Sequence, residues 1–509
     1  MIHLNFKIQI KLFISLVWIL INSISCLSQG RNSVWLLGHH YSSTSAEGRI
    51  NFTQSAYSVL TEQRVIPFKD TEGNISDDNG NLLMSSNGVF RADATGDTMQ
   101  NGSGLNPGWA VNNYQDGIPM PYANLFLPFP QDSNKYILFH QIADLTINLL
   151  SRDILYSVVD FSSNPLGEVI SKNNIALTDT FSWGFAACKH GNGRDWWITA
   201  LSKDATGLHT FLLSPDTLQY MGIQNFPSQI FLGGYAGQPS FSPNGTKFAY
   251  AGSYGINGMN YQSAVTLFNF DRCNGTFSLD TVIDFSDNYI SFASTFSPSS
   301  QYLYFASSEH LYQYDTDAGG LIPHQLVANN DTFLSAPPVF YTNFYLMYLA
   351  ANGKIYMTSG SGVLDLHEMD YPDSAGVTCN VNLHNVHLPC FNVGTIPNHP
   401  NYYLGRLVGS PCDTLTSIND PPEHDFRFKV FPNPVMDGNI KIIYLLPQNK
   451  SGRLEIYDDN GRLVFEMKLP PWSTTQYISL PSHLNSGVYT CVVSSGIDRK
   501  TKKLIIYND

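Results

Sequence analysis

The sequence has few charged residues and, beyond its N-terminus, no long apolar run. Asp, Glu, Lys and Arg together make up 14% of its 509 residues. After residue 28, no stretch approaches the roughly 18 consecutive apolar residues that a membrane-spanning helix needs. None of the seven cysteines has the CxxC spacing typical of zinc and thiol-redox sites. We therefore expect a main body without a transmembrane segment and without a zinc or redox centre.

Motifs of catalysis and cofactor binding are also missing. The sequence contains no GxSxG elbow, no phosphate-binding P-loop, no dinucleotide fingerprint and no HExxH zinc motif. The acidic stretch at 70–80 superficially resembles a calcium loop, but it lacks the glutamate at the twelfth position, so turn formation explains it better. No pair of carboxylates stands out as a glycosidase site. We expect no metal and no organic cofactor.

Aromatic and turn-forming residues, in contrast, are abundant. Aromatic residues make up 13% of the chain, which also has 39 glycines and 28 prolines, and this balance favours an all-β fold with many turns. Residues 29–424 contain 15 Lys and Arg against 33 Asp and Glu, a net charge of −18, whereas residues 425–509 contain 11 against 8, a net charge of +3. An acidic main body argues against nucleic acid or an anionic membrane as the partner.

The first 28 residues have the pattern of a secretory signal peptide. Lys7 and Lys11 form a basic start, residues 12–21 form an apolar core, and small residues lead to a cleavage site between Ser28 and Gln29. A lipoprotein signal that uses Cys26 is the alternative, although residues 23–25 match its leucine-led motif poorly. Either signal predicts export from the cytoplasm.

A strand, a polar turn and a second strand recur along residues 34–358. Successive copies lie 48 to 60 residues apart, and their strongest strands begin near Val34, Leu82, Tyr136, Trp196, Lys247, Tyr302 and Lys354. A drifting period near fifty predicts the four-stranded blades of a β-propeller, because a solenoid would repeat more tightly. Seven strong strands favour seven blades, with six or eight as the alternatives.

The best-defined copy covers residues 238–285. It contains four runs rich in β-branched and aromatic residues, and its breaks at Asn244-Gly245 and Asn274-Gly275 suit tight turns. Four antiparallel strands cannot bury both faces of their sheet alone, so each copy needs copies of itself as neighbours.

The two ends of the repeat predict how the ring closes. The chain enters at Val34 on what looks like a second strand without a first, and residues 392–403 look like a first strand without its followers. Joining the two would complete one blade from both ends and remove exposed sheet edges. We expect these two segments to pair as strands.

Several blocks resemble a known group of propellers. The blocks include VWLLGHH at 34–40, DTEGNISDDNGNLLMSSNGVF at 70–90 and HGNGRDWWITA at 190–200. They resemble the exported bacterial WD40-like or PD40-like propellers, over about residues 33–405. The resemblance implies a fold and carries no known chemistry.

The composition changes after residue 412. Residues 413–425 are polar, contain Pro-Pro and have no apolar period, which indicates a linker. The block at 426–509 then contains seven strand-like runs at 428–431, 439–446, 452–458, 464–469, 475–480, 487–494 and 503–507. Strands this short and close predict a small Ig-like β-sandwich. We therefore divide the chain into a signal peptide (1–28), a propeller (29–412), a linker (413–425) and a sandwich (426–509).

Three motifs of the last block resemble the type A C-terminal sorting domain of the type IX secretion system. They are FKVFPNP at 428–434, LEIYDDNGRLVFE at 454–466 and LNSGVYTCVVSSGIDRKTKKLIIY at 484–507. The resemblance implies export across the outer membrane by this machinery, removal of the domain by a sorting protease and, in many relatives, surface attachment. The matching residues are Pro432, Asn433, Pro434, Gly461, Gly487, Tyr489, Lys502 and Lys503. Phe431 in place of Tyr and Cys491 in place of an apolar residue are mild departures.

The strongest candidate for ligand binding is the run at 190–197. His190, Arg194 and Asp195 could hold an anionic or sugar ligand at a blade mouth, with Trp196 as a stacking platform. In the alternative interpretation, which we favour, Arg194 and Asp195 fix a tight turn and the two adjacent tryptophans fill layers between blades.

Histidines and cysteines near residue 400 offer weaker candidates. His384, His387 and His399 could bind a metal, but HxxH spacing on a strand places the first two rings on opposite sides. Cys379, Cys390 and Cys412 lie close in sequence, and export permits disulfides, so we expect one pair among these three.

These patterns predict an exported, surface-attached binding or interaction protein. Its partner would be a surface protein or a glycan, besides the type IX secretion machinery and its sorting protease. The alternative is an extracellular hydrolase of glycans or peptides with its site in the propeller funnel. It comes second because no catalytic residues stand out in the sequence.

Overall fold

The computed structural model describes residues 30–507 except 40–46, 54–55, 145–149, 204, 228–236, 257–259, 286–290, 319–322, 336–339, 414–427, 437, 445, 447–450, 471–474 and 496–497. The signal peptide with Ser28 and Gln29, Cys26 and nearly all of the linker lie outside the described residues. Helical structure in the described part is limited to η1 (Gly30–Asn32), α2 (Trp109–Asn113) and η2 (Gly376–Cys379). The expected all-β fold is confirmed.

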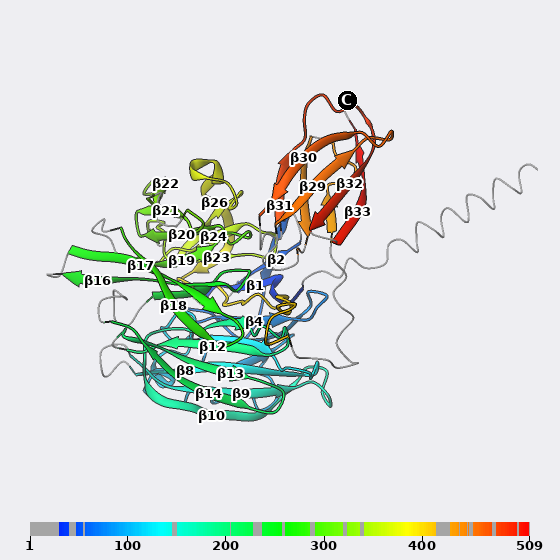
Figure 1. The fold of residues 1–509 in the computed structure, drawn as a ribbon. Coiled ribbons are helices and arrows are strands. Elements are labelled where there is room, and N and C mark those ends of the chain that lie inside the picture. Colours follow the sequence, from blue (N-terminus) through cyan, green and yellow to red (C-terminus); the bar gives the residue numbers. More distant parts are fainter. Residues whose placement is uncertain are drawn as a thin grey trace, which may run out of the picture.

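Seven antiparallel sheets follow one another between Val34 and Asn392, in chain order (Figure 1). The first two have three strands: β1 (Val34–Leu37), β2 (Glu47–Phe52) and β3 (Tyr57–Glu62), then β4 (Gly73–Ser76), β5 (Leu82–Ser86) and β6 (Arg91–Asp93). The third has β7 (Asn124–Pro128), β8 (Lys135–Asp144), β9 (Leu150–Asp160) and β10 (Glu168–Phe181).

The other four sheets also have four strands each. The fourth contains β11 (Ala186–Lys189), β12 (Trp196–Leu201), β13 (Gly207–Leu213) and β14 (Leu218–Asn225), and the fifth contains β15 (Gly237–Phe241), β16 (Lys247–Ile256), β17 (Asn260–Asp271) and β18 (Thr276–Asp284). The sixth contains β19 (Ser291–Phe296), β20 (Tyr302–Ser307), β21 (His310–Asp315) and β22 (Gln325–Asn329). The seventh contains β23 (Met347–Leu349), β24 (Ile355–Met357), β25 (Val363–Met369) and β26 (Val381–Asn392).

The sheets form a closed ring, as expected for a seven-bladed propeller. Around the ring, β1 contacts β4, β4 contacts β7, β10 contacts β14, β11 contacts β15, β15 contacts β19, β19 contacts β23, and β26 contacts β2. The first and seventh sheets also meet where the Trp35 ring lies edge-on to Tyr356, with 5.6 Å between ring centroids. The strong strands expected from the sequence are β1, β5, β8, β12, β16, β20 and β24, each beginning within one residue of its expected start.

Burial explains which residues form which strand. β12, inside the fourth sheet, is buried at every position, whereas the outermost strand β14 is mostly exposed. In the fifth sheet, Gly245 has a φ of +72°, and Asn244 accepts the backbone N–H of Thr246 at 2.9 Å. This glycine supplies the left-handed conformation that the turn between β15 and β16 needs.

The ring has two faces with different contents. The turn between the first and second strand of each blade, for example 190–195, 242–246 and 350–354, lies on one face, which we call the turn face. The connections between sheets lie on the opposite face, which we call the loop face. In Figure 1 the hairpin of β16 and β17 projects from the loop face on the left.

The expectation that residues 392–403 pair with β1 as a strand is wrong. β1 begins at the turn face, where Arg31 forms an ion pair with Asp78 at 2.7 Å, and it runs to the loop face as second strands do. However, 393–403 form no strand, and the first sheet contains only β1, β2 and β3 among the described residues. Residues 393–403 run from the loop face to the turn face, which is the direction of a first strand. Their backbone is irregular, because their hydrogen bonds go to several blades instead of one neighbouring strand.

We call residues 393–412 the strap. It starts at the loop face, where Gly394 donates its N–H to Ser359 O at 3.0 Å. It then passes between innermost strands: His399 Nε2 lies 2.8 Å from Asn74 Oδ1 of β4, and Tyr402 donates its hydroxyl to Phe126 O of β7 at 3.0 Å. Because these partners line the centre of the ring, the strap fills that centre.

Other contacts complete the filling of the centre. Ile396, Asn398, His399 and Tyr402 are all buried. Asn398 donates its side-chain N–H to Phe185 O at 2.9 Å. Beside the strap, Gln238 of β15 donates its amide N–H to Met347 O of β23 at 2.6 Å. Gln238 therefore joins the fifth and seventh blades, which are not neighbours in the ring.

The strap ends at the turn face in a disulfide bond between Cys412 and Cys273. The pairing expected among Cys379, Cys390 and Cys412 is therefore wrong, because Cys379 and Cys390 are buried and unpaired in two different sheet interfaces. The true partner, Cys273, lies 139 residues before Cys412, in the turn between β17 and β18. The threaded path of the strap brings the two sulfur atoms together.

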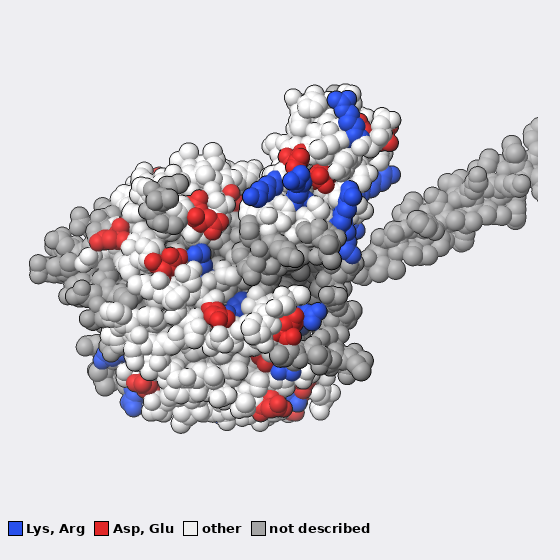
Figure 2. All heavy atoms as spheres, viewed as in Figure 1, with Lys and Arg blue, Asp and Glu red and all other residues white. Residues whose placement is uncertain are grey.

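The C-terminal block is a sandwich of two sheets. One sheet contains β27 (Phe428–Phe431), β28 (Asn439–Tyr444) and β31 (Thr475–Ser479), and the other contains β30 (Leu463–Leu469), β29 (Gly452–Tyr457), β32 (Gly487–Ser495) and β33 (Asp498–Ile506). Its core includes Ile442, Ile456 and Val493. All seven expected strands are confirmed. Figure 2 shows several Lys and Arg side chains on this domain.

A substitution beside the disulfide tests the path of the strap. A Cβ atom on Gly191 would lie 2.2 Å from Cys412 Sγ and 3.0 Å from Cys273 Sγ. We expect Gly191→Ala to prevent the disulfide, so that thiol titration of the denatured protein finds about two additional thiols per chain. Gly405→Ala is the matched control, because Gly405 also lies in the strap and its Cβ would meet no atom within 4 Å. Equal thiol counts in the two variants would contradict the path described.

Candidate functional site

The run proposed for ligand binding forms the turn between β11 and β12. Asn192 Oδ1 accepts the backbone N–H groups of Arg194 and Asp195, both at 3.0 Å. The Asp195 carboxylate accepts from Asn192 Nδ2 at 2.7 Å and from Arg194 Nε at 2.6 Å. These bonds lie within the turn, which agrees with the structural interpretation that we favoured from the sequence.

The same turn holds the end of the strap. Leu407 donates its N–H to Gly191 O at 2.6 Å. His190 Nε2 lies 3.1 Å from Cys273 O, one of the two disulfide-bonded residues. Burial lowers the pKa of His190, which keeps this imidazole neutral at physiological pH. The turn therefore acts as the docking point of the strap.

Neither tryptophan of the run faces solvent. Trp196 is fully buried, and its ring lies edge-on to Tyr402 of the strap with 6.0 Å between centroids. Lys189 Nζ lies 3.9 Å from the centroid of the Trp196 ring, and burial lowers the pKa of this amine to about 7. Ligand binding by His190, Arg194, Asp195 and Trp196 stays a prediction, and it would require the strap to move away from Trp196.

The three histidines considered for a metal do not meet. His399 lies in the strap, whereas His384 and His387 lie on β26 and bind different carboxylates. His384 Nε2 is 2.9 Å from Asp331, and His387 Nδ1 is 2.9 Å from Asp365. Among the residues that the structure describes, no group of three His, Cys, Asp or Glu could hold a metal ion. In the acidic stretch at 70–80, residues 73–76 form β4 and the residues after them form a turn, in which Asp77 accepts the N–H of Asn79 at 2.9 Å.

A hairpin of the loop face was missed by the sequence analysis. It connects β22 to β23, where Ser335 donates its N–H to Phe340 O at 3.0 Å and Thr342 donates its N–H to Phe333 O at 2.9 Å. Four apolar side chains of this hairpin are exposed, and we call them the apolar patch: Phe333 (37%), Leu334 (46%), Phe340 (40%) and Tyr341 (58%). The apolar and aromatic run FLSAPPVFY at 333–341, between polar residues on both sides, was the signal that could have revealed it.

Polar contacts fix the apolar patch to the seventh sheet. The Phe333 ring stacks on His384 with 4.0 Å between centroids. Ser335 donates its hydroxyl to Asp365 at 3.0 Å, and Asp365 also holds His387, whose side chain is 72% exposed. The patch is therefore bordered by oriented imidazole and carboxylate groups, the combination of apolar surface and few polar groups that binding sites favour.

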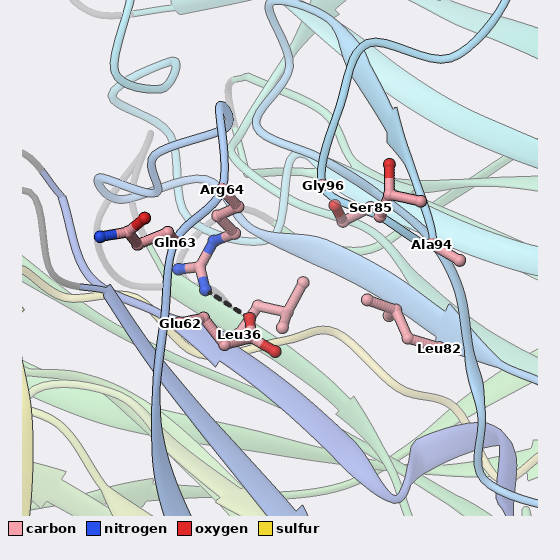
Figure 3. Close-up of a pocket in the computed structure, with 9 residues that line it drawn as sticks. Leu36, Glu62, Gln63, Arg64, Leu82, Ser85, Ala94 and Gly96 are labelled. Atoms are coloured by element: carbon pink, nitrogen blue, oxygen red, sulfur yellow. Dashed lines mark hydrogen bonds and ion pairs between the residues drawn. The ribbon is translucent and has the colours of Figure 1, made fainter.

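A small pocket lies between the first and second sheets (Figure 3). Its volume is about 140 Å³, below the roughly 300 Å³ of typical small-molecule sites. Arg64 on its wall binds Glu47 at 3.2 Å and Glu62 at 3.0 Å. Burial raises the pKa of Glu47 to about 7, an effect that Arg64 opposes. The hydroxyl of Ser85 has no hydrogen-bond partner in the described part of the chain, whereas the Thr95 hydroxyl in the same lining donates to Asp93 at 2.6 Å.

The residues of the sorting motifs come together in the sandwich. Asn433 donates its side-chain N–H to Lys503 O at 2.6 Å and accepts the N–H of Ile505 at 2.8 Å. The first and last motifs are therefore bonded to each other. Gly461 forms the turn before β30 with a φ of +77°, and Tyr489 donates its hydroxyl to Asn485 O at 2.9 Å. The remaining sorting residues lie in the same first and last motifs. Pro432 and Pro434 follow β27, Gly487 is the first residue of β32, and Lys502 lies on β33.

Comparison with known families identifies this block. Residues 429–507 match the family described as the secretion system C-terminal sorting domain. The chain therefore ends in a type IX sorting domain, which directs export through the periplasm to the cell surface or the extracellular space. In the described part of the chain, no helix is long and apolar enough to cross a membrane.

Similarity to other proteins is otherwise distant. No curated protein sequence matches this chain. PorZ of Porphyromonas gingivalis, described as an essential surface component of the type IX secretion system, is 12% identical over 91% of this chain and 68% of its own, with a TM-score of 0.31. A putative TolB of Agrobacterium tumefaciens is 15% identical over 56% of this chain and 87% of its own, with a TM-score of 0.30. Likenesses this weak carry no functional argument.

The buried histidine of the strap predicts a pH dependence of stability. Burial lowers the pKa of His399 to about 4, so between pH 6.5 and 4 the unfolded chain binds a proton that the folded chain does not. The contribution of His399 to stability is full above pH 6.5 and is lost as pH falls, at up to about 1.4 kcal/mol per pH unit. Urea unfolding from pH 7 to 4.5 should show a smaller slope for His399→Gln. His387→Gln, at a mostly exposed side chain, is the control, and an unchanged slope in His399→Gln would refute the role of this site.

Proposed function

We propose that this protein is a binding module of the cell surface, delivered by the type IX system, which recognises its partner through the loop face of the propeller. The observation that carries the proposal is the apolar patch. Its four side chains are 37–58% exposed on one hairpin. Because soluble proteins normally bury apolar surface of this kind, an exposed patch indicates an interaction site.

The centre of the ring supports binding at the loop face over catalysis in a funnel. The strap, with its buried residues Ile396 and His399, fills the centre where a funnel site would lie. The pocket beside Arg64 is small, and its charged groups are bound to each other. A hydrolase of glycans or peptides is the alternative, and it would have to place its catalytic groups outside the centre.

The surroundings of the apolar patch favour a partner with both apolar and hydrogen-bonding surface. Phe333 and Tyr341 offer ring faces and edges, and the His387–Asp365 pair beside them offers a donor and acceptors in fixed orientation. Glycans and proteins of the cell surface both have this character. The acidic propeller disfavours an anionic partner.

A paired substitution tests this proposal. We expect the mature protein to bind one or more members of a panel of immobilised surface polysaccharides and surface proteins without releasing reducing ends or peptides. Phe340→Ser with Tyr341→Ser should weaken that binding at least about tenfold, the loss of about 1.4 kcal/mol that removal of two exposed rings can cause.

The control for this experiment is Ile175→Ser. Ile175 is 66% exposed on β10, an outer strand away from the hairpin, so its loss changes exposed apolar area without touching the apolar patch. Equal binding by the patch variant and this control would contradict the loop-face site. Turnover of any polymer in the panel would favour the hydrolase instead.

A further inference from the structure

The sorting domain contacts the turn face of the propeller through one side of its smaller sheet. Lys441 of β28 donates from Nζ to Asn352 O, in the turn between β23 and β24, at 3.0 Å. Lys441 and Tyr477 are cross-strand partners on β28 and β31, so both side chains lie on the outer side of that sheet. Lys441 Nζ lies 5.0 Å from the centroid of the Tyr477 ring.

A second aromatic ring extends this contact into the propeller. Tyr477 lies edge-on to Tyr371 of the seventh blade, with 5.9 Å between ring centroids. Edge-to-face is one of the two arrangements that pairs of aromatic rings prefer. The contact therefore combines an amine, two aromatic rings and a backbone carbonyl from two domains.

The backbone at Gly353 makes room for the approach. A Cβ atom at this position would lie 3.0 Å from Lys441 Nζ and 3.5 Å from Tyr477 Oη. Gly353 has a φ of +80°, which glycine adopts without strain. The absence of a side chain here lets Lys441 reach the carbonyl of Asn352.

The charges at the contact are complementary but partly withdrawn from water. Burial lowers the pKa of Lys441 to about 8, while the carboxylate of Asp373 opposes this change and Lys354 adds to it. Residues 425–509 have a net charge of +3 and residues 29–424 a net charge of −18, so long-range attraction favours docking. Desolvation of Lys441 limits the strength of the contact, which suits a contact that is later broken.

We propose that the sorting domain acts as an intramolecular cap on the propeller: before it is removed, it contacts and partly covers a patch of the turn face formed by Asn352, Gly353, Tyr371 and Asp373, although Tyr371 keeps 44% of its surface exposed. Removal of the domain exposes that patch, so the secreted precursor and the mature protein present different turn faces. The occupant is a segment of this chain, and the contacts above define its position. The removal itself rests on the export route that the sorting domain indicates.

Hydrogen exchange of the purified precursor tests the cap. In the unaltered chain, amides at 350–354 and 371–377 should exchange slowly, and Lys441→Glu should speed them at least about tenfold, the effect of losing about 1.4 kcal/mol of docking free energy. Lys468→Glu makes the same charge change on β30 of the same domain, at an exposed position, and should leave these amides unchanged. Equal exchange in the two variants would overturn the proposal.

A variant on the propeller side guards against a folding defect in the sorting domain. Tyr371→Ala removes the ring that Tyr477 contacts and leaves the sandwich sequence intact. It should speed exchange at 439–443 and 475–479, on the other side of the contact. Unchanged exchange there would also overturn the cap. Because this test uses no binding partner, its failure would leave the proposed loop-face function standing.

Discussion

The passage of the strap through the centre of the ring is the constraint on which the rest of the structure depends. A propeller must join its first and last blades, and closure by a shared strand would use one continuous ladder. Here Asn398, His399 and Tyr402 instead bond to four different blades, and the disulfide at Cys412 fixes the end. The contact of β26 with β2 joins the last blade to the first, while the strap links blades that lie further apart and fills the centre of the ring.

The two faces of the ring carry different parts of the structure. The turn face receives the end of the strap, the disulfide and the sorting domain, which are the parts concerned with stability and delivery. The loop face carries the apolar patch and the long hairpin of β16 and β17 (Figure 1). Recognition through the apolar patch, as we propose it, can then change independently of export, because a substitution in the patch touches neither Cys273 nor Lys441.

Features that depend on local chemistry could be predicted from the sequence. The turn at Asn244-Gly245 needs only the positive φ of glycine, and the seven strands of the sandwich follow from alternating burial and short turns. Features that depend on distant contacts could not. Cys273 and Cys412 are 139 residues apart, so proximity in sequence pointed to Cys379 and Cys390 instead. His399 resembled a metal ligand by residue type alone, and its role appears only when the strap is placed beside Asn74.

The accessibility of a thiol introduced at position 396 tests the central claim most directly. Ile396 is 2% exposed in the centre of the ring, whereas Val408 is 64% exposed near the end of the same strap. When Ile396→Cys and Val408→Cys are compared under native conditions, we predict that the Val408→Cys variant reacts at once with a thiol reagent. The thiol of the Ile396→Cys variant should react only as fast as the propeller unfolds. A rate for Ile396→Cys within about tenfold of that for Val408→Cys would show that the centre is open, and it would contradict the account.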